Sequence, residues 1–130
     1  MEIWGKIEMT KSIVYTVAVK GNRREWRFKG KIHRLDGPAI IEGNYQSWWV
    51  NGELHRDNGP AIINRNYQLW YENGKLHRLD GPAYINGNKQ EWCIEGKQYT
   101  KEQFDEKTKK APCVNKEVVI DGVTYKLVPK

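Results

Sequence analysis

Three histidines are the residues of this chain best suited to chemistry, because imidazole can act as a general base or bind a metal ion near neutral pH. His33, His55 and His77 each begin one short phrase, which reads HRLDGPA, HRDNGPA and HRLDGPA at a spacing of 22 residues. Equivalent positions in successive two-stranded repeats lie about 9.5 Å apart. Zinc holds its ligand nitrogens at about 2.0–2.1 Å. The three histidines therefore cannot share one ion, and we predict that they order their loops.

The other polar residues of the phrase have two chemical interpretations. Asp36 and Asp80 precede glycine, where short polar side chains hydrogen-bond their own backbone in turns. The repeated arginines can either pair with the neighbouring aspartate or present a guanidinium fork to an acidic partner, and the sequence leaves both roles open. These are Arg34, Arg56 and Arg78.

Catalytic signatures are missing from the sequence. It contains no glycine-rich phosphate loop, no nucleophile elbow and no paired-cysteine motif. We therefore expect a protein that is not an enzyme and has no cofactor and no metal site.

The elements that position the phrase follow the same period. Tryptophans fall at 26, 48, 70 and 92, and a fixed period of this length marks a repeat architecture. Each copy predicts a strand through its tryptophan, a glycine-containing turn, the HR phrase, and a second short strand that begins after Gly-Pro. The first strands are expected at Arg24–Phe28, Tyr45–Val50, Tyr67–Tyr71 and Gln90–Ile94, and the second at Ala39–Ile41, Ala61–Ile63 and Ala83–Ile85. The predicted fold class is mostly β, an antiparallel repeat meander.

One domain of 130 residues is expected. Residues 1–20 would form a capping strand region, with an apolar β-branched run at 13–19, and Trp4 suggests a worn repeat copy there. Residues 21–99 hold the repeats. Residues 100–112 predict a short helix with a capping box formed by Thr100 and Gln103. Residues 113–130 predict a hairpin across Asp121-Gly122 that packs against the sheet and covers its last edge.

Composition narrows the class of protein. Cys93 and Cys113 lack metal-type spacing, so free thiols in a reducing, cytoplasmic setting are expected. No stretch approaches the ~20 apolar residues of a membrane span. The net charge of +6 favours acidic partners.

An aromatic patch is the predicted partner-binding surface. The tryptophan column is expected to face the core, with Trp26 sharing its face with Phe28, and Ala39 with Ile41. Other rings fall on the opposite face, and exposed aromatic patches mark interfaces. The patch consists of Tyr45, Trp49, Tyr67 and Tyr71, with Arg34, Arg56 and Arg78 at its rim.

Nucleic-acid binding is the alternative, through aromatic stacking and the basic first copy, which contains Arg23, Arg24 and Arg27. The second copy has only Arg56 against Glu53 and Asp57, so the array is not uniformly basic, and we favour a protein partner. A bare sheet edge at 13–19 would also allow two copies of the chain to pair as a homo-oligomer.

The segment from Trp70 to Asn88, WYENGKLHRLDGPAYINGN, resembles the MORN repeat in its aromatic, its Asn-Gly-Lys and its loop histidine. The resemblance covers roughly residues 21–99 and is to a divergent MORN-like family of small phage and giant-virus proteins; the closing IDGVTYKLVPK also looks like the tails of small phage proteins. It implies an elongated β-meander that binds without catalysis. It further implies a phage-type accessory factor that binds, in the host cytoplasm, a host defence or regulatory protein and modulates or inhibits it.

Overall fold

The computed structural model describes residues 13–109 and 117–126, and within them the chain is an antiparallel β-meander with one short helix. The first half contains β1 (Thr16–Lys20), β2 (Arg23–Phe28), β3 (Lys31–Ile32), β4 (Ile40–Glu42), β5 (Tyr45–Ser47), β6 (Trp49–Val50), β7 (Glu53–Leu54) and β8 (Ile62–Ile63). The second half contains β9 (Tyr67–Leu69), β10 (Tyr71–Glu72), β11 (Lys75–Leu76), β12 (Tyr84–Asn86), β13 (Lys89–Ile94), β14 (Lys97–Tyr99), α2 (Lys101–Thr108), β15 (Glu117–Ile120) and β16 (Val123–Lys126). The predicted fold class is confirmed.

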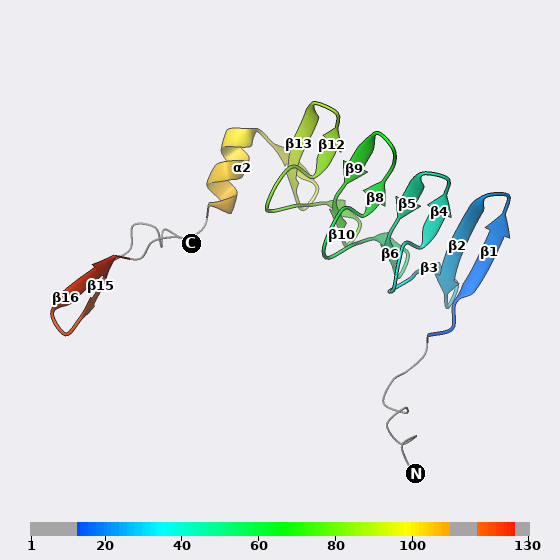
Figure 1. Ribbon diagram of the computed structural model, residues 1–130, viewed down its shortest axis with the longest axis horizontal. Helices are drawn as coiled ribbons and strands as arrows, with labels where there is room; N and C mark the ends of the chain where they lie inside the picture. Colours follow the sequence, from blue (N-terminus) through cyan, green and yellow to red (C-terminus); the bar gives the residue numbers. More distant parts are fainter. Residues whose placement is uncertain (1–12, 110–116, 127–130) are drawn as a thin grey trace, which may run out of the picture.

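Long hairpins form the main sheet, which lies as a row of successive repeats (Figure 1). Its strand order is β1-β2-β4-β5-β8-β9-β12-β13-β14, and β3 pairs with the end of β2. Each neighbouring pair is antiparallel, so the chain runs along the sheet without a crossover. Short turns join β4 to β5, β8 to β9 and β12 to β13, whereas the connections from β5 to β8 and from β9 to β12 pass through a short hairpin and the loop that carries the HR phrase.

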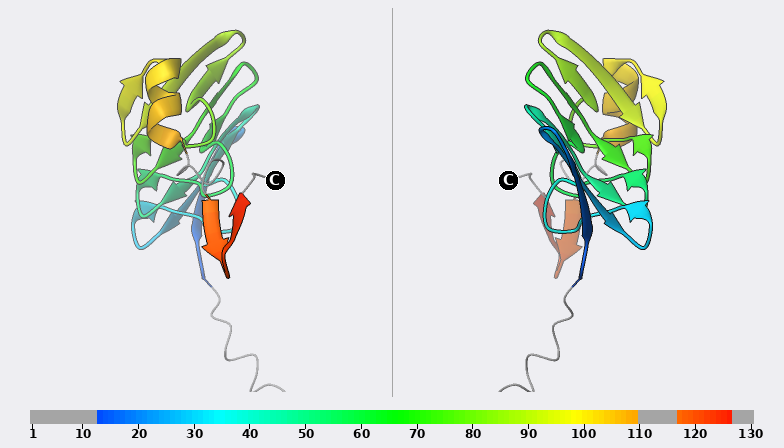
Figure 2. Two further views of the ribbon diagram at one scale, coloured as in Figure 1. Left: turned by 90° about the vertical axis from the view of Figure 1, so that its left-hand side faces the viewer. Right: turned by 90° about the vertical axis from the view of Figure 1, so that its right-hand side faces the viewer.

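A second row consists of short hairpins, seen on the other side of the stack from the long ones in Figure 2. β6 pairs with β7 and β10 with β11. Their turns use two residues of positive φ, for example Asn51 (51°) and Gly52 (82°), which is the geometry of a type I′ hairpin. The glycine amide of each turn also bonds the preceding repeat, as from Gly52 N to Ile32 O at 2.8 Å. The predicted turns are thus confirmed, and they also link one repeat to the next.

The predicted strands are in the right positions, but two of them are each divided into two shorter strands. Trp48 and Trp70 interrupt the long strands expected at 45–50 and 67–71, because the backbone leaves the main sheet there to enter a short hairpin. The short strands after the turns were not predicted, since two residues are too few for an alternating pattern to register.

The core is built on the alanine that follows each Gly-Pro. Ala39, Ala61 and Ala83 are fully buried. The amide of Ala39 donates to Ser47 O and its carbonyl accepts from Trp26 N, both at 2.8 Å, so the backbone is clamped between two strands with no room for a larger side chain. Ile40, rather than Ile41, is the buried isoleucine, which corrects the predicted core face.

The last repeat is covered by the helix. α2 begins with the predicted capping box on Thr100 and ends at Thr108, and its buried Phe104 packs against Trp92 with ring centroids 6.4 Å apart. The β15–β16 hairpin has its predicted register, with Ile120 opposite Val123. It forms a two-stranded sheet of its own and pairs with no described strand of the main sheet, so the prediction that it packs against that sheet and covers its last edge finds no support in the strand pairing. The parts of the predicted end regions at 1–12, 110–116 and 127–130 lie outside the described residues, including Trp4, the end of the predicted helix region and Cys113.

Candidate binding site

The histidines fasten each loop to the next repeat. The Nδ1 atom of each histidine accepts a hydrogen bond from a backbone amide 18 residues later in the chain. The donors are Asn51 N to His33 at 2.9 Å, Asn73 N to His55 at 3.1 Å and Glu95 N to His77 at 3.0 Å. Each accepting Nδ1 must be unprotonated, which defines the tautomer. The predicted loop-ordering role is therefore confirmed, and the described residues contain no cluster of three groups suited to a metal ion.

Each repeated arginine places its guanidinium over the tryptophan ring of its own repeat. The guanidinium carbon is 4.0 Å from the ring centroid in the pair Arg34–Trp26, 3.8 Å in Arg56–Trp48 and 3.9 Å in Arg78–Trp70. This is the geometry of a strong cation–π contact. The sequence predicted that these tryptophans face an apolar core. They are instead half-buried, each beneath a cation.

The loop glycine closes the other side of the guanidinium. A side-chain carbon placed on Gly59 would lie 3.2 Å from Arg56 Cζ, and one on Gly81 would lie 2.7 Å from Arg78 Cζ. Neither glycine has positive φ, so it is the available space and not the backbone conformation that favours glycine here. The proline carbonyl then accepts from Nη1, at 3.0 Å for both Arg56 to Pro60 and Arg78 to Pro82.

The middle loop (residues 55–61) differs from the first (33–39) and third (77–83) in the partner of its arginine Nε atom. Nε of Arg34 donates to Asp36 Oδ1 at 2.9 Å, and Nε of Arg78 donates to Asp80 Oδ1 at 2.8 Å. These bonds hold the pKa of both carboxyl groups below the ordinary value. In the middle loop the aspartate stands one residue earlier, and Asp57 Oδ1 instead lies 2.8 Å from His55 Nε2.

Arg56 consequently has no carboxylate partner within the described residues, and Asn58 occupies the position of the missing aspartate. Burial lowers the pKa of its guanidinium, and no carboxylate counteracts that effect. The sequence left open whether the arginines pair with the neighbouring aspartate or face an acidic partner. Arg34 and Arg78 pair with their aspartates, and Arg56 does not.

Arg56 lines a cleft of about 520 Å³ between the second and third loops. Its other ionisable lining groups are Asp57, Glu72, His77, Arg78 and Asp80, and its apolar surface comes from Trp70, Tyr71 and Leu79. Leu79 is 56% exposed. Aromatic surface, an exposed leucine and an unpaired cation therefore meet in one concave place.

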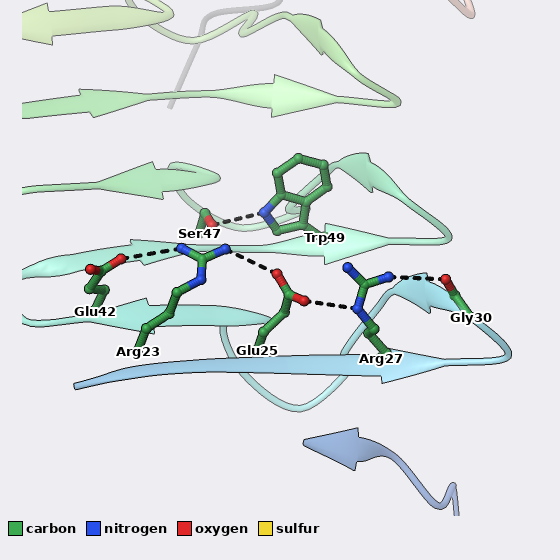
Figure 3. Close-up of polar contacts among 7 residues, drawn as sticks. All are labelled: Arg23, Glu25, Arg27, Gly30, Glu42, Ser47 and Trp49. Carbon is green, nitrogen blue, oxygen red and sulfur yellow. Dashed lines mark hydrogen bonds and ion pairs between the residues drawn. The ribbon is translucent and has the colours of Figure 1, made fainter. Parts of the chain in front are cut away.

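The predicted aromatic patch is half-buried rather than open. Trp49 uses its indole N–H to bond Ser47 Oγ at 2.8 Å (Figure 3). The pKa of Tyr71 is raised by burial first and then by the nearby Cys93 and Tyr45, so these residues lie close together. Tyr67 is half-buried as well, with its hydroxyl 3.4 Å from Asn64 Nδ2. Of the four rings, only Tyr71 also lines the large cleft.

Two of the three arginines of the alternative nucleic-acid surface pair with glutamates of the same copy (Figure 3). Arg23 pairs with Glu25 at 3.0 Å and with Glu42 at 3.2 Å, and Arg27 pairs with Glu25 at 2.8 Å. Burial acts to raise the pKa of Glu25, but the bonds from Arg27 and Arg23 outweigh it and the pKa is lowered. Arg24, the third residue of the alternative nucleic-acid surface, is exposed.

The sandwich of tryptophan, arginine and glycine was not predicted, although the sequence contains a signal for it. An arginine follows the tryptophan by eight residues and a glycine follows the arginine by three in every copy that has the loop. Trp92 has no such arginine, and Phe104 of α2 covers it instead. Cys93 is buried with a free thiol, and burial raises its pKa. No helix in the described part of the chain is long and apolar enough to cross a membrane.

Fold and site together define an antiparallel β-meander repeat protein whose loops present stacked arginines. Searches of protein-family models, of curated proteins and of solved structures found no match to this chain.

Proposed function

We propose that this chain is a non-enzymatic β-repeat protein that binds another protein. The observation that carries the proposal is the cleft of about 520 Å³, because it combines aromatic surface from Trp70 and Tyr71 with the guanidinium of Arg56. Tryptophan, tyrosine and arginine are the residues most enriched at the energetic centres of protein interfaces.

The biological setting rests on the resemblance of the repeats to a divergent MORN-like family. In that setting the chain is a phage-type accessory factor, and it acts in the host cytoplasm by binding a host defence or regulatory protein and modulating or inhibiting it. The lining of the cleft supports a binding role over catalysis, because its carboxylates already have side-chain partners and its one histidine, His77, already accepts a hydrogen bond from a backbone amide.

A pull-down of the tagged chain from host lysate tests this function, performed with and without nuclease and at low and moderate salt. A single protein that stays bound under all four conditions supports the proposal. If all captured material is lost on nuclease treatment, the nucleic-acid alternative replaces it, and Arg24 becomes the first residue to mutate, since Arg23 and Arg27 are paired with glutamates.

Two double variants identify the surface. Trp49→Ala with Tyr71→Ala removes two of the predicted contact rings, and Lys89→Ala with Lys97→Ala removes exposed charges elsewhere on the sheet as a matched control. We expect capture to fall at least tenfold for the first pair and to persist for the second. Thermal unfolding of both variants must accompany the assay, because Trp49 also bonds Ser47. If the first pair folds and still captures the partner, the aromatic surface assignment is wrong.

A further inference from the structure

We propose that Arg56 is a receptor for a carboxylate side chain of the partner, which occupies the place that Asp36 and Asp80 fill in the flanking loops. The inference rests on the proposed protein-binding function and specifies its chemistry: the partner presents an acidic residue next to an apolar one. The binding group is the Nε–H of the guanidinium, with the cleft between the second and third loops as its surroundings.

The guanidinium of Arg56 is held in place before any ligand arrives. Trp48 lies on one side at 3.8 Å, Gly59 closes the other side, and Pro60 O accepts from Nη1 at 3.0 Å. The two flanking arginines have the same three contacts and in addition bond a carboxylate oxygen through Nε at 2.8–2.9 Å. The same protein thus shows twice how a carboxylate binds to this arrangement. Because the arginine is already fixed, its side-chain entropy is not lost on binding.

The middle loop cannot supply this carboxylate itself. Asn58 has the position of the aspartate but no negative charge. Asp57 is directed to His55 Nε2, 2.8 Å away, and its side chain is 77% exposed. A partly buried cation without a counter-ion is costly, as the lowered pKa of Arg56 indicates, and an incoming carboxylate would relieve this cost through a charge-assisted hydrogen bond.

The charges of the cleft favour a carboxylate over a phosphate. Asp57, Glu72 and Asp80 line it with Arg56, and the remaining cation, Arg78, already pairs with Asp80. A dianionic phosphate would meet these carboxylates, whereas one carboxylate needs only Nε of Arg56. The apolar surface from Trp70 and the exposed Leu79 suits an aliphatic neighbour of the acidic residue.

The test uses capped peptides and the Arg56 Nε–H signal in nuclear magnetic resonance spectra of the full chain. Leu–Glu–Leu is titrated against Leu–Gln–Leu as its uncharged control, and inorganic phosphate is titrated separately. We expect a saturable shift of the Arg56 signal with the glutamate peptide, at least tenfold weaker binding of the glutamine peptide, and no comparable response to phosphate at equal ionic strength.

Two substitutions make the test specific. Asn58→Asp installs the carboxylate of the flanking loops and is expected to abolish the peptide response while leaving the fold intact. Asp80→Asn frees Nε of Arg78 and is expected to create a second, equivalent response at that arginine. An Arg56 signal that does not respond to the glutamate peptide, or that responds equally in the Asn58→Asp variant, overturns the inference. A stronger response to phosphate also overturns it, in favour of a phosphate site.

The two proposals fail in distinguishable ways. If the pull-down captures a protein whose binding is the same for wild type and Asn58→Asp, protein binding stands and the carboxylate site is rejected. If no protein is captured while the peptide shifts Arg56, the local chemistry is right and the proposed function has failed.

Discussion

The middle loop and its two neighbours have one architecture but a different charge balance. All three stack an arginine on a tryptophan, at 4.0, 3.8 and 3.9 Å, and all three bond it to the proline carbonyl. Only the outer two add an aspartate. The shared contacts are therefore what builds the repeat, because they are sufficient to hold Arg56 without the aspartate.

The difference separates structural from functional use of one side chain. Where the carboxylate is internal, the guanidinium is neutralised and serves the fold. In the middle loop the same guanidinium has the same contacts to tryptophan and proline but no carboxylate partner among the described residues, so its Nε–H is available to a ligand. A repeat protein can thus create a site by removing a partner in one copy.

The largest effect is expected at the histidine of the first loop. His33 is 6% exposed, packs against Phe28 with ring centroids 5.5 Å apart and accepts from Asn51 N. His33→Ala leaves both a cavity and an unpaired amide, so the free energy of unfolding should fall by about 2–4 kcal/mol. His55→Ala, at the less buried equivalent position in the middle loop, should cost about half as much. Urea unfolding measures both, and equal losses would contradict the difference in burial.

Removing the arginines should distinguish the loops next. Arg78→Ala loses the stacking contact, the bond to Pro82 and the bond to Asp80, for about 2 kcal/mol. Arg56→Ala loses only the first two kinds of contact and also removes a partly desolvated, unpaired cation, so we expect about 1 kcal/mol. The measurement is again the urea midpoint. A larger loss for Arg56→Ala would show that its guanidinium has an internal partner after all.

Replacing the loop glycines Gly81 and Gly59 by alanine should change the stability less than removing the arginines, and by different amounts at the two positions. In Gly81→Ala the new carbon would lie 2.7 Å from Arg78 Cζ and push the guanidinium off Trp70, so we expect a loss of about 1 kcal/mol. In Gly59→Ala the corresponding distance is 3.2 Å, and the gain from a less flexible unfolded chain, about 0.4–1 kcal/mol, should offset the strain. Thermal unfolding of the pair checks this order, and a Gly59→Ala variant that is the less stable of the two would contradict it.

Acid should affect the outer loops before the middle one. The folded-state pKa values of Asp36 and Asp80 are lowered by hydrogen bonds from Arg34 and Arg78. A lowered pKa stabilises the fold above the ordinary aspartate value near 3.9, and this contribution is lost as pH falls through the folded value. Because both carboxyls are well exposed, the effect is small.

A double variant isolates this acid effect. Asp36→Asn with Asp80→Asn should be slightly less stable than wild type at pH 7 and should converge with it below pH 4. Thermal midpoints measured between pH 7 and 3 give the comparison. A stability difference that is constant over this range would show that the two aspartates do not act through their charge.

The periodicity of the sequence predicted most of the fold, because strands, turns and the helix cap follow from local patterns. Asn51-Gly52 and Thr100 act as their residue types dictate. The bend at Trp48 was not predictable, since it depends on the pairing of its amide with Ala61 O, 13 residues later. The hairpin at 117–126 was predicted in register, whereas no local signal specifies its relation to the sheet.

The candidate site was predicted only in part, for a related reason. Arg56 was named, but as one of three equivalent residues at the rim of an aromatic patch. Its difference from Arg34 and Arg78 depends on which side chain accepts from Nε, and that follows from the displacement of one aspartate by one position. The sequence displays this displacement in Asp57-Asn58, but its consequence is visible only once the three loops can be compared in space.

The most direct measurement of this account is the exchange rate of the three arginine Nε–H protons with water, followed by nuclear magnetic resonance in wild type and in Asn58→Asp. The account predicts slow exchange for Arg34 and Arg78, fast exchange for Arg56, and slowing of Arg56 to the rate of the other two in the variant. Slow exchange of Arg56 in the wild type, unchanged by Asn58→Asp, would mean that its Nε is already bonded within the molecule, and would contradict the claim that the middle loop holds an open site.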